Sequence, residues 1–286
     1  SVMGEQDVLE VIKEVKSHFN VDSERIFLMG HSMGGAGTMS IGLHYPSMFG
    51  ALTSIDAAGS RSADNPWFMN ACNQNIYIKE AGNGIGGKAE DAQTPALVEA
   101  GAFVTREVFP GMPHHFAPQR SYAMFIPQLI QQPIPINAPE VKFYTDNLRY
   151  NQAYWITIDQ LVAPNADSTV HAVYDDGQPE PPRPGSAAAT RPRASAPVGK
   201  SSITIKTTNI SAMTLKLAGA VVPDGAAMPV VIDGQTVLEG RIPAIAHVAR
   251  TDGKWALVEE PALAGKRHGM QGPLWDAFTT PFLSVY

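Results

Sequence analysis

The pattern of apolar positions in the first half of the chain switches between a helical period and short continuous runs. Residues 5–19 predict a helix whose apolar face carries Val8, Leu9, Ile12, Val15 and Phe19. Short apolar runs, typical of buried parallel strands, follow at 25–30, 51–55, 76–79 and 103–109. Further helices are expected after residue 32, ending before Pro46, and near 89–100. Strands that alternate with helices predict an α/β layer built on a parallel sheet.

From about residue 141 the pattern changes to short alternating strands without helices. These runs lie at 154–161, 169–174, 203–207, 213–217 and 254–258, and they predict a β-rich, sandwich-like domain. The segment 175–200 is rich in Pro, Ala and Ser and has no aromatic residue. It is expected to be a mobile loop between two strands of the second domain. The predicted domains are therefore 1–138 and 139–286.

Composition narrows the class of protein further. The 286 residues are 44% hydrophobic and 17% charged, which is a globular balance. A formal net charge of −6 argues against nucleic acid or an anionic membrane as the main partner. The single cysteine, Cys72, excludes an internal disulfide and a cysteine-built metal site. Neither a membrane-spanning apolar run nor a basic-then-apolar signal peptide is found, and the compartment stays open.

Candidate chemistry begins at residues 30–38, GHSMGGAGT, with the spacing Gly30-x-Ser32-x-Gly34. The motif stands between a predicted strand and a predicted helix, where a sharp turn exposes a serine hydroxyl above the sheet. The glycines remove side chains that would clash there. The backbone N–H of Met33 then faces a developing oxyanion, helped by the positive end of the helix. The alternative is a glycine-rich turn with a purely structural role.

A serine nucleophile needs a base within hydrogen-bond reach. VFPGMPHHFAP, at 108–118, supplies two histidines just past the predicted strand at 103–109. His114 directly follows an expected loop at 110–113 and is the first choice, with His115 second. His31, beside Ser32, is expected to point elsewhere.

Metal and cofactor motifs are weak in this sequence. The adjacent pair His114 and His115 has no third ligand at metal spacing, so no metal is expected. GNGIGG, at 82–87, lacks the frame of a dinucleotide-binding loop, so no cofactor is expected either.

These motifs carry a family resemblance. RIFLMGHSMGGAGT with the preceding DVLEVIKEVKSHFNVDSE resembles the nucleophile region of bacterial esterases of the polyhydroxybutyrate-depolymerase and prolyl-oligopeptidase-like α/β-hydrolase group. FPGMPHHF is similar to the catalytic-histidine loop of that group, which implies His114 as the base. The segments TTNISAMTLKL, DGQ (233–235) and KW (254–255) resemble the β-rich domain that follows the hydrolase domain in large members. The resemblance implies an α/β-hydrolase esterase, secreted or periplasmic.

The chain departs from the group at the triad acid. Such hydrolases carry the acid in a Gly-Asp-x-Asp-like loop, but here that place reads KEAGNGIGGKAED, at 79–91. Asp56, at the end of the predicted strand 51–55, is the slightly favoured substitute. Glu80 is the other choice, and Asp91 is less favoured because it falls on the following helix. Each carboxylate has a buried or capping role as its alternative.

A second departure is that only 31 residues precede Ser32, fewer than the group's leading strands need. The chain is therefore expected to be a fragment, a processed form or a rearranged minimal hydrolase that lacks the usual N-terminal strands. The sheet edge left exposed favours association with a second chain, so a homo-oligomer is one expectation.

Two functions remain open from the sequence. The first is a serine carboxylesterase that acts on small soluble esters through Ser32, His114, Asp56 and the Met33 N–H. The second is a weak or inactive hydrolase remnant whose β domain binds a polymer or another protein. A peptidase ranks third, because amides need a better-organised oxyanion hole.

Overall fold

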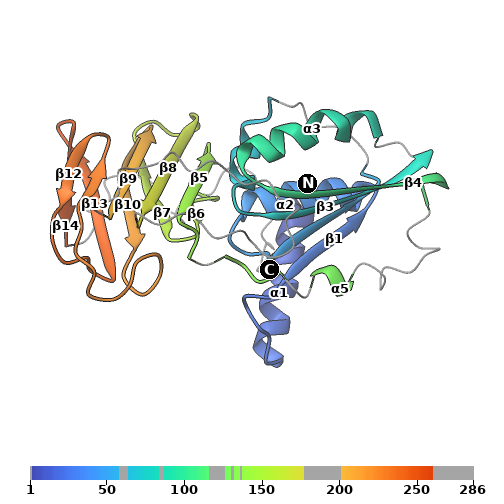
Figure 1. The fold of residues 1–286 in the computed structure, drawn as a ribbon, viewed down its shortest axis with the longest axis horizontal. Helices are drawn as coiled ribbons and strands as arrows, with labels where there is room; N and C mark the ends of the chain where they lie inside the picture. Colours follow the sequence, from blue (N-terminus) through green and yellow to red (C-terminus); the bar gives the residue numbers. More distant parts are fainter. Residues whose placement is uncertain are drawn as a thin grey trace, which may run out of the picture.

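The computed structural model describes residues 2–57, 64–83, 87–115, 126–129, 132–135, 137–176 and 201–259. The elements before residue 130 are α1 (Val2–His18), β1 (Phe27–His31), α2 (Met33–His44), β2 (Ala51–Ile55), the 3₁₀ helix η1 (Pro66–Ala71), β3 (Asn75–Asn83), α3 (Gly87–Ala100), β4 (Phe103–Pro113) and α5 (Ile126–Leu129). Figure 1 shows this part beside a second part made of strands that are mostly antiparallel. The fold is α/β with an added β-rich region, as the sequence predicts.

A four-stranded parallel sheet in the order β1-β2-β3-β4 organises the first part. Every residue of β2 is buried, as expected for an apolar strand covered on both faces. The register aligns His31 with Ile55, and Ile55 with Lys79. Since the strands are parallel, the residues that follow β1 and β2 emerge together at one edge of the sheet. This alignment brings Ser32 and Asp56 to the same place.

Helix α2 lies very close to the sheet. A Cβ placed on Gly42 would stand 2.2 Å from a methyl carbon of Leu52, so only glycine permits this approach. The side chains beneath the helix form one core cluster with those of β2, β3 and α3, including Leu43, Leu52, Ile76 and Leu97. The close packing seats the C-terminal half of α2 directly on β2.

Strand β4 is longer than the predicted strand at 103–109, and the loop expected at 110–113 was wrong. The strand runs to Pro113 and pairs with β3 as far as Asn83, with a register shift after Ala81. Gly111 at φ +73° supplies a left-handed backbone conformation within this stretch. The prolines and the glycine suggested a loop, but an irregular pair of long strands accommodates them. The pair projects the residue after Pro113 beyond β1 and β2.

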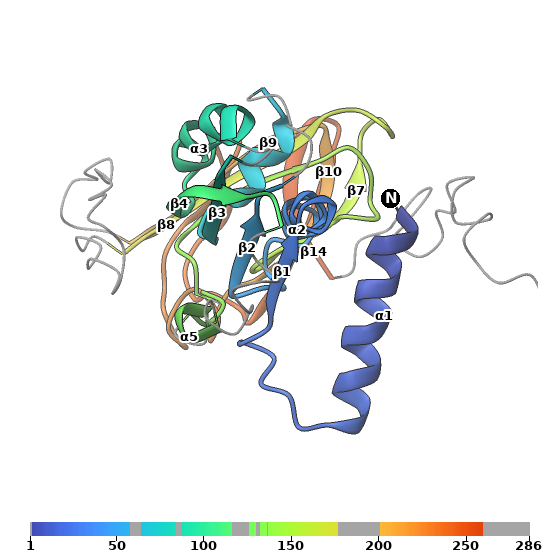
Figure 2. The ribbon, with the colours of Figure 1, turned by 90° about the vertical axis from the view of Figure 1, so that its right-hand side faces the viewer.

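Helix α1 packs only part of the apolar face predicted for residues 5–19 against the core, and it ends at His18, one residue before Phe19. Val8 and Ile12 pack against the core, whereas Val15 and Phe19 are 42% and 69% exposed. The helix stands beside β1, the edge strand of the sheet (Figure 2). The helical period was therefore read correctly, but the extent of its buried face was not.

Glu5 fastens α1 to the rest of the molecule. Its carboxylate is 4% exposed; Nδ1 of His44 lies 2.5 Å from Oε2, and the Tyr150 hydroxyl donates to Oε1 at 2.8 Å. Burial by itself raises the pKa of Glu5. The hydrogen bonds from His44 and Tyr150, with the charges of His44 and Arg149, outweigh burial and lower that pKa overall. Burial and the Glu5 charge raise the pKa of Tyr45 to about 12, so this hydroxyl stays protonated and also donates to Glu5.

Glu5→Gln is expected to lower the free energy of unfolding at neutral pH by about 1–3 kcal/mol, because buried donors lose a charged acceptor. Since folding lowers the pKa of Glu5, its stabilisation is complete above its ordinary value of 4.5 and is lost as the pH falls through the folded-state pKa. Urea unfolding of the variant should therefore depend less on pH in the acid range. The exposed Glu10→Gln on the same helix is the control. Parallel pH profiles for wild type and Glu5→Gln would contradict this role.

The second part contains two five-stranded sheets, in the orders β14-β13-β10-β7-β6 and β12-β11-β9-β8-β5. Their strands are β5 (Glu140–Thr145), β6 (Gln152–Ala153), β7 (Ile156–Leu161), β8 (Ser168–Asp175), β9 (Ser202–Thr208), β10 (Ile210–Lys216), β11 (Val230–Ile232), β12 (Gln235–Leu238), β13 (Ile245–Thr251) and β14 (Lys254–Val258). All neighbours are antiparallel except β9 and β11. One apolar cluster draws on both sheets, as in a sandwich.

The DGQ and KW segments noted in the sequence lock two strand pairs together. The Asp233 carboxylate accepts from the Trp255 indole N–H at 2.9 Å and from the Thr207 backbone and hydroxyl at 2.7 Å each. The Gln235 side chain accepts from the Trp255 backbone N–H at 2.9 Å. These residues therefore stabilise the β-rich part.

The segment predicted as a loop at 175–200 falls almost wholly outside the described residues. The strands on either side of it, β8 and β9, pair with each other up to Asp175 and Ser202. The change from the parallel sheet to the antiparallel sheets falls between Pro113 and Glu140. The division at residue 138 stays a prediction.

The two parts meet where η1 covers β5. The Asn70 side chain donates to the carbonyl of Tyr144 at 3.0 Å and accepts from its N–H at 2.6 Å, so one amide satisfies both backbone groups of an edge strand. The Tyr154 hydroxyl donates to the Cys72 carbonyl at 3.0 Å. In the part of the chain that the structure describes, no helix is both long and apolar enough to span a bilayer.

Candidate active site

Ser32 occupies the turn between β1 and α2 in a strained backbone conformation, with φ 56° and ψ −119°. Its N–H donates to the carbonyl of Ile55 at 2.8 Å, which ties the turn to the end of β2. A Cβ on Gly30 would lie 2.2 Å from the carbonyl oxygen of Gly34, so the turn closes only because residue 30 is glycine. The first glycine of the motif thus has a direct steric cause, whereas a Cβ on Gly34 would meet nothing within 4 Å, so the expected clash at that position is not found. The turn presents the serine hydroxyl at the strand ends.

His114 reaches Ser32 from the end of β4. Its Nε2 lies 2.8 Å from the Ser32 hydroxyl oxygen, although 82 positions separate the two residues. The imidazole is 31% exposed, so one side of it faces solvent. The long projection of β4, rather than a loop at 110–113, carries the ring across the sheet edge to the serine.

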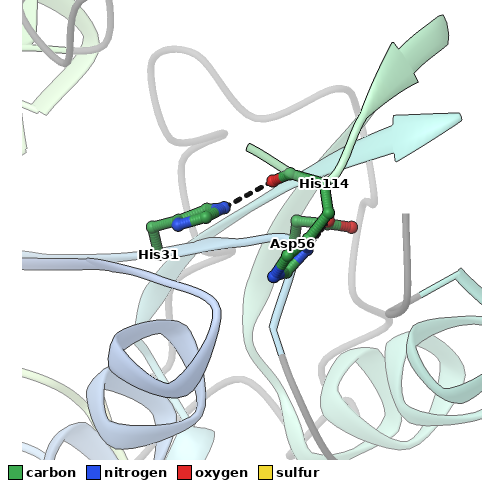
Figure 3. Close-up of side chains that lie close together, drawn as sticks. All are labelled: His31, Asp56 and His114. Atoms are coloured by element: carbon green, nitrogen blue, oxygen red, sulfur yellow. Dashed lines mark hydrogen bonds and ion pairs between the residues drawn. The ribbon is translucent and has the colours of Figure 1, made fainter. Parts of the chain in front are cut away.

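Asp56 completes a chain of hydrogen bonds. It follows β2, is fully buried, and its Oδ2 is bonded to Nδ1 of His114; Figure 3 shows the two side chains together. The Asp56 N–H donates to the Lys79 carbonyl at 2.7 Å, which fixes the turn that carries it. A carboxylate accepts, so Nδ1 of His114 carries the proton and Nε2 accepts from the Ser32 hydroxyl. The other oxygen, Oδ1, is buried without a hydrogen-bond partner among the described residues.

The structure separates Asp56 from the alternative acids. Glu80 is 1% exposed, and its Oε2 accepts from Arg106 on β4, at 2.8 Å from Nε and 2.6 Å from Nη2. Its partner is therefore an arginine, not the histidine. Asp91 lies on α3. Among the carboxylates considered from the sequence, Asp56 is the one that lies against His114.

His115 and Met33, the other two predicted site residues, have exposed side chains. His115 is exposed, next to the histidine that contacts Ser32. Met33 is the first residue of α2, where N–H groups have no acceptor within the helix. Its side chain is 82% exposed, so the apolar group beside the nucleophile faces solvent. The oxyanion role of its N–H stays a prediction.

His31 contradicts the expectation that it points away from the site. Its Nε2 lies 2.6 Å from the backbone carbonyl oxygen of His114, and the two imidazole rings are 4.8 Å apart between centroids (Figure 3). As the middle residue of the predicted turn it was expected to point elsewhere, but it meets a carbonyl that lies just past the end of the distant strand β4. No local sequence signal could have identified this contact.

His31, Asp56 and His114 also form a group whose potential metal-binding atoms lie within 4.8 Å of one another. Metal binding needs free ring nitrogens. Both nitrogens of His114 already take part in hydrogen bonds, and so does Nε2 of His31. The hydrogen bonds account for this cluster, and we assign no metal to it.

The aromatic residues after Asp56 pack in the core instead of facing the serine. Phe68 is 4% exposed and belongs to the cluster beneath α2. The Trp67 ring makes edge contacts with His44, Tyr144 and Tyr150, with centroids 4.5–5.4 Å apart. Packing therefore describes these rings better than a substrate pocket does.

The comparisons with known proteins point to esterases. Residues 9–81 match the model of the family Esterase, described as "Putative esterase", a range that holds Ser32 and Asp56 but not His114. Crystal structures with similarity include SOBER1 of Arabidopsis thaliana, at 20% identity and a TM-score of 0.37, over 46% of this chain and 62% of SOBER1. A thermostable esterase is similar at 22% identity and a TM-score of 0.39, over 45% of this chain and 36% of that one.

The alignments therefore span less than two thirds of either solved structure. No curated protein sequence matches the chain significantly. The similarity is to esterases in general, and the depolymerase and oligopeptidase-like subgroup expected from the sequence stays a prediction.

Proposed function

We propose that this chain is a serine carboxylesterase with the triad Ser32, His114 and Asp56. The observation that carries the proposal is the continuous hydrogen-bond chain from the Ser32 hydroxyl through the imidazole to a buried carboxylate. A strained serine at a strand–helix turn, with an oriented base, is the arrangement needed to activate a hydroxyl. The match of residues 9–81 to an esterase family supports the same activity.

The reaction follows from the positions of these groups. As the Ser32 hydroxyl oxygen attacks the ester carbonyl carbon, its proton passes to Nε2 of His114. The oxyanion formed is stabilised by the Met33 N–H at the positive end of α2. When the intermediate collapses, the C–O bond to the alcohol breaks, and the alcohol leaves with the proton from Nε2. An acyl-Ser32 ester remains.

Water completes the cycle by the same route in reverse. It gives a proton to Nε2 while its oxygen attacks the acyl carbon, and the second collapse returns that proton to Ser32 and releases the carboxylic acid. Asp56 stays ionised throughout, holding the Nδ1 proton and stabilising the imidazolium. The exposed side of His114 and the exposed Met33 side chain leave the site open to solvent, and the substrates we propose are small, soluble esters. We propose no cofactor.

The identity of the acid is tested by two matched amide variants. In p-nitrophenyl acetate and butyrate hydrolysis, Asp56→Asn is expected to lower kcat by about 10³–10⁴-fold, because an amide there stabilises the wrong imidazole tautomer. Glu80→Gln, which changes a buried carboxylate bonded to Arg106, is expected to keep kcat within a few-fold of wild type. Thermal unfolding of both variants separates catalytic from folding effects.

Two outcomes would contradict the proposal. If Asp56→Asn retains wild-type kcat while Glu80→Gln loses it, the acid is misassigned. If the wild-type chain does not exceed the uncatalysed rate, the esterase proposal fails. A binding function for the β-rich part, in a catalytically inactive relative of the hydrolases, would then take its place.

A further inference from the structure

The hydrogen bond from His31 to His114 joins the two sides of the proposed active site. A carbonyl oxygen only accepts, so Nε2 of His31 carries a proton and donates it across the 2.6 Å contact. Both neutral imidazole with the proton on Nε2 and the imidazolium ion can donate in this way. The contact therefore does not depend on the protonation state of His31.

This hydrogen bond holds a backbone segment that lies beyond the end of a strand. His114 lies one residue beyond Pro113, where the ladder between β3 and β4 ends after its register shift. The backbone at residue 114 has thus left the support of regular strand pairing. His31 is the last residue of β1 and immediately precedes Ser32. Its hydrogen bond ties the backbone of the proposed base to the turn that holds the proposed nucleophile.

We propose that His31 is a positioning residue, which sets the place of His114 relative to Ser32 by holding the His114 carbonyl. This inference rests on the proposed esterase function and adds a residue to its machinery. By holding the His114 backbone, this hydrogen bond sets the distance between Nε2 of His114 and the Ser32 hydroxyl. Asp56 instead sets the rotation of the His114 ring, through its hydrogen bond to Nδ1. Displacement of a catalytic group by about 1 Å costs on the order of 10²-fold in rate.

Three substitutions of His31 test the role of its N–H donor separately from that of its aromatic ring. Gln at residue 31 keeps an N–H donor near the position of Nε2, Met has a similar length without a donor, and Phe keeps a ring without a donor. In p-nitrophenyl acetate hydrolysis, we expect His31→Met and His31→Phe to lower kcat by about 10–100-fold with KM within about 3-fold of wild type. His31→Gln is expected to recover kcat to within a few-fold.

Recovery of kcat in His31→Gln, which keeps an N–H donor, would distinguish a positioning role of His31 from a general packing role. Thermal unfolding is measured for every variant, and if His31→Phe fails to fold, the pair Gln and Met still carries the comparison. Wild-type kcat in His31→Met, or equal impairment in His31→Gln and His31→Met, would overturn the inference. A wild-type chain without turnover would instead contradict the esterase proposal, so the two failures can be told apart.

Discussion

Ser32→Ala is expected to lower kcat for p-nitrophenyl acetate hydrolysis by about 10⁴–10⁶-fold, one of the two largest effects expected for this chain. The variant removes the only atom that forms the acyl bond, so neither the imidazole nor the carboxylate can compensate. The cost to folding should be small, because the strained conformation at φ 56° is no harder for alanine to adopt than for serine. Residual turnover would reflect binding and oxyanion stabilisation alone.

The control for this variant is Ser17→Ala on α1, where the exposed hydroxyl donates to the Glu14 carbonyl at 2.7 Å and its oxygen lies 2.9 Å from Nδ1 of His18. It should keep the wild-type rate. If Ser32→Ala and wild type hydrolyse the ester equally well, Ser32 is not the nucleophile. Any activity present would then come from another group of the protein.

The second large effect on kcat is expected from substitution of His114, with the adjacent His115 as its control. His114→Gln is expected to lower kcat by about 10⁴–10⁶-fold, comparable to loss of the nucleophile, since serine and base act as a unit. His115→Gln, one residue away and exposed, is expected to leave kcat within a few-fold of wild type. Steady-state rates for acetate and butyrate esters, with thermal unfolding of both variants, make the comparison. Greater loss in His115→Gln than in His114→Gln would contradict the assignment.

Local pattern was sufficient to predict elements that carry Ser32 and Asp56. The apolar run at 51–55 coincides with β2, and the helix expected to end before Pro46 ends at His44. These predictions succeeded because a buried parallel strand and a helix beside a glycine turn both leave a dense signature of apolar and small residues. Ser32 and His114 were also named from motifs, since the turn and the histidine segment are local.

Features set by distant contacts were predicted less well. The sequence favoured Asp56 over Glu80 only slightly, because both follow or end predicted strands and only the position of Arg106 shows where Glu80 points. The length of β4 was missed because Pro110, Gly111 and Pro113 favour a loop locally, while pairing with β3 overrides that preference. The contact of His31 depends on the same long strand, so it was missed for the same reason.

Covalent labelling of Ser32 tests the central proposal most directly. The intact wild-type chain is treated with a fluorophosphonate, which reacts with activated serine hydroxyls and does not depend on the natural substrate. Its intact mass is measured, followed by mass spectrometry of its peptides. The proposed triad predicts a single adduct, on the peptide that contains Ser32, and none in the Ser32→Ala variant. An unmodified wild-type chain, or an adduct confined to another residue, would contradict it.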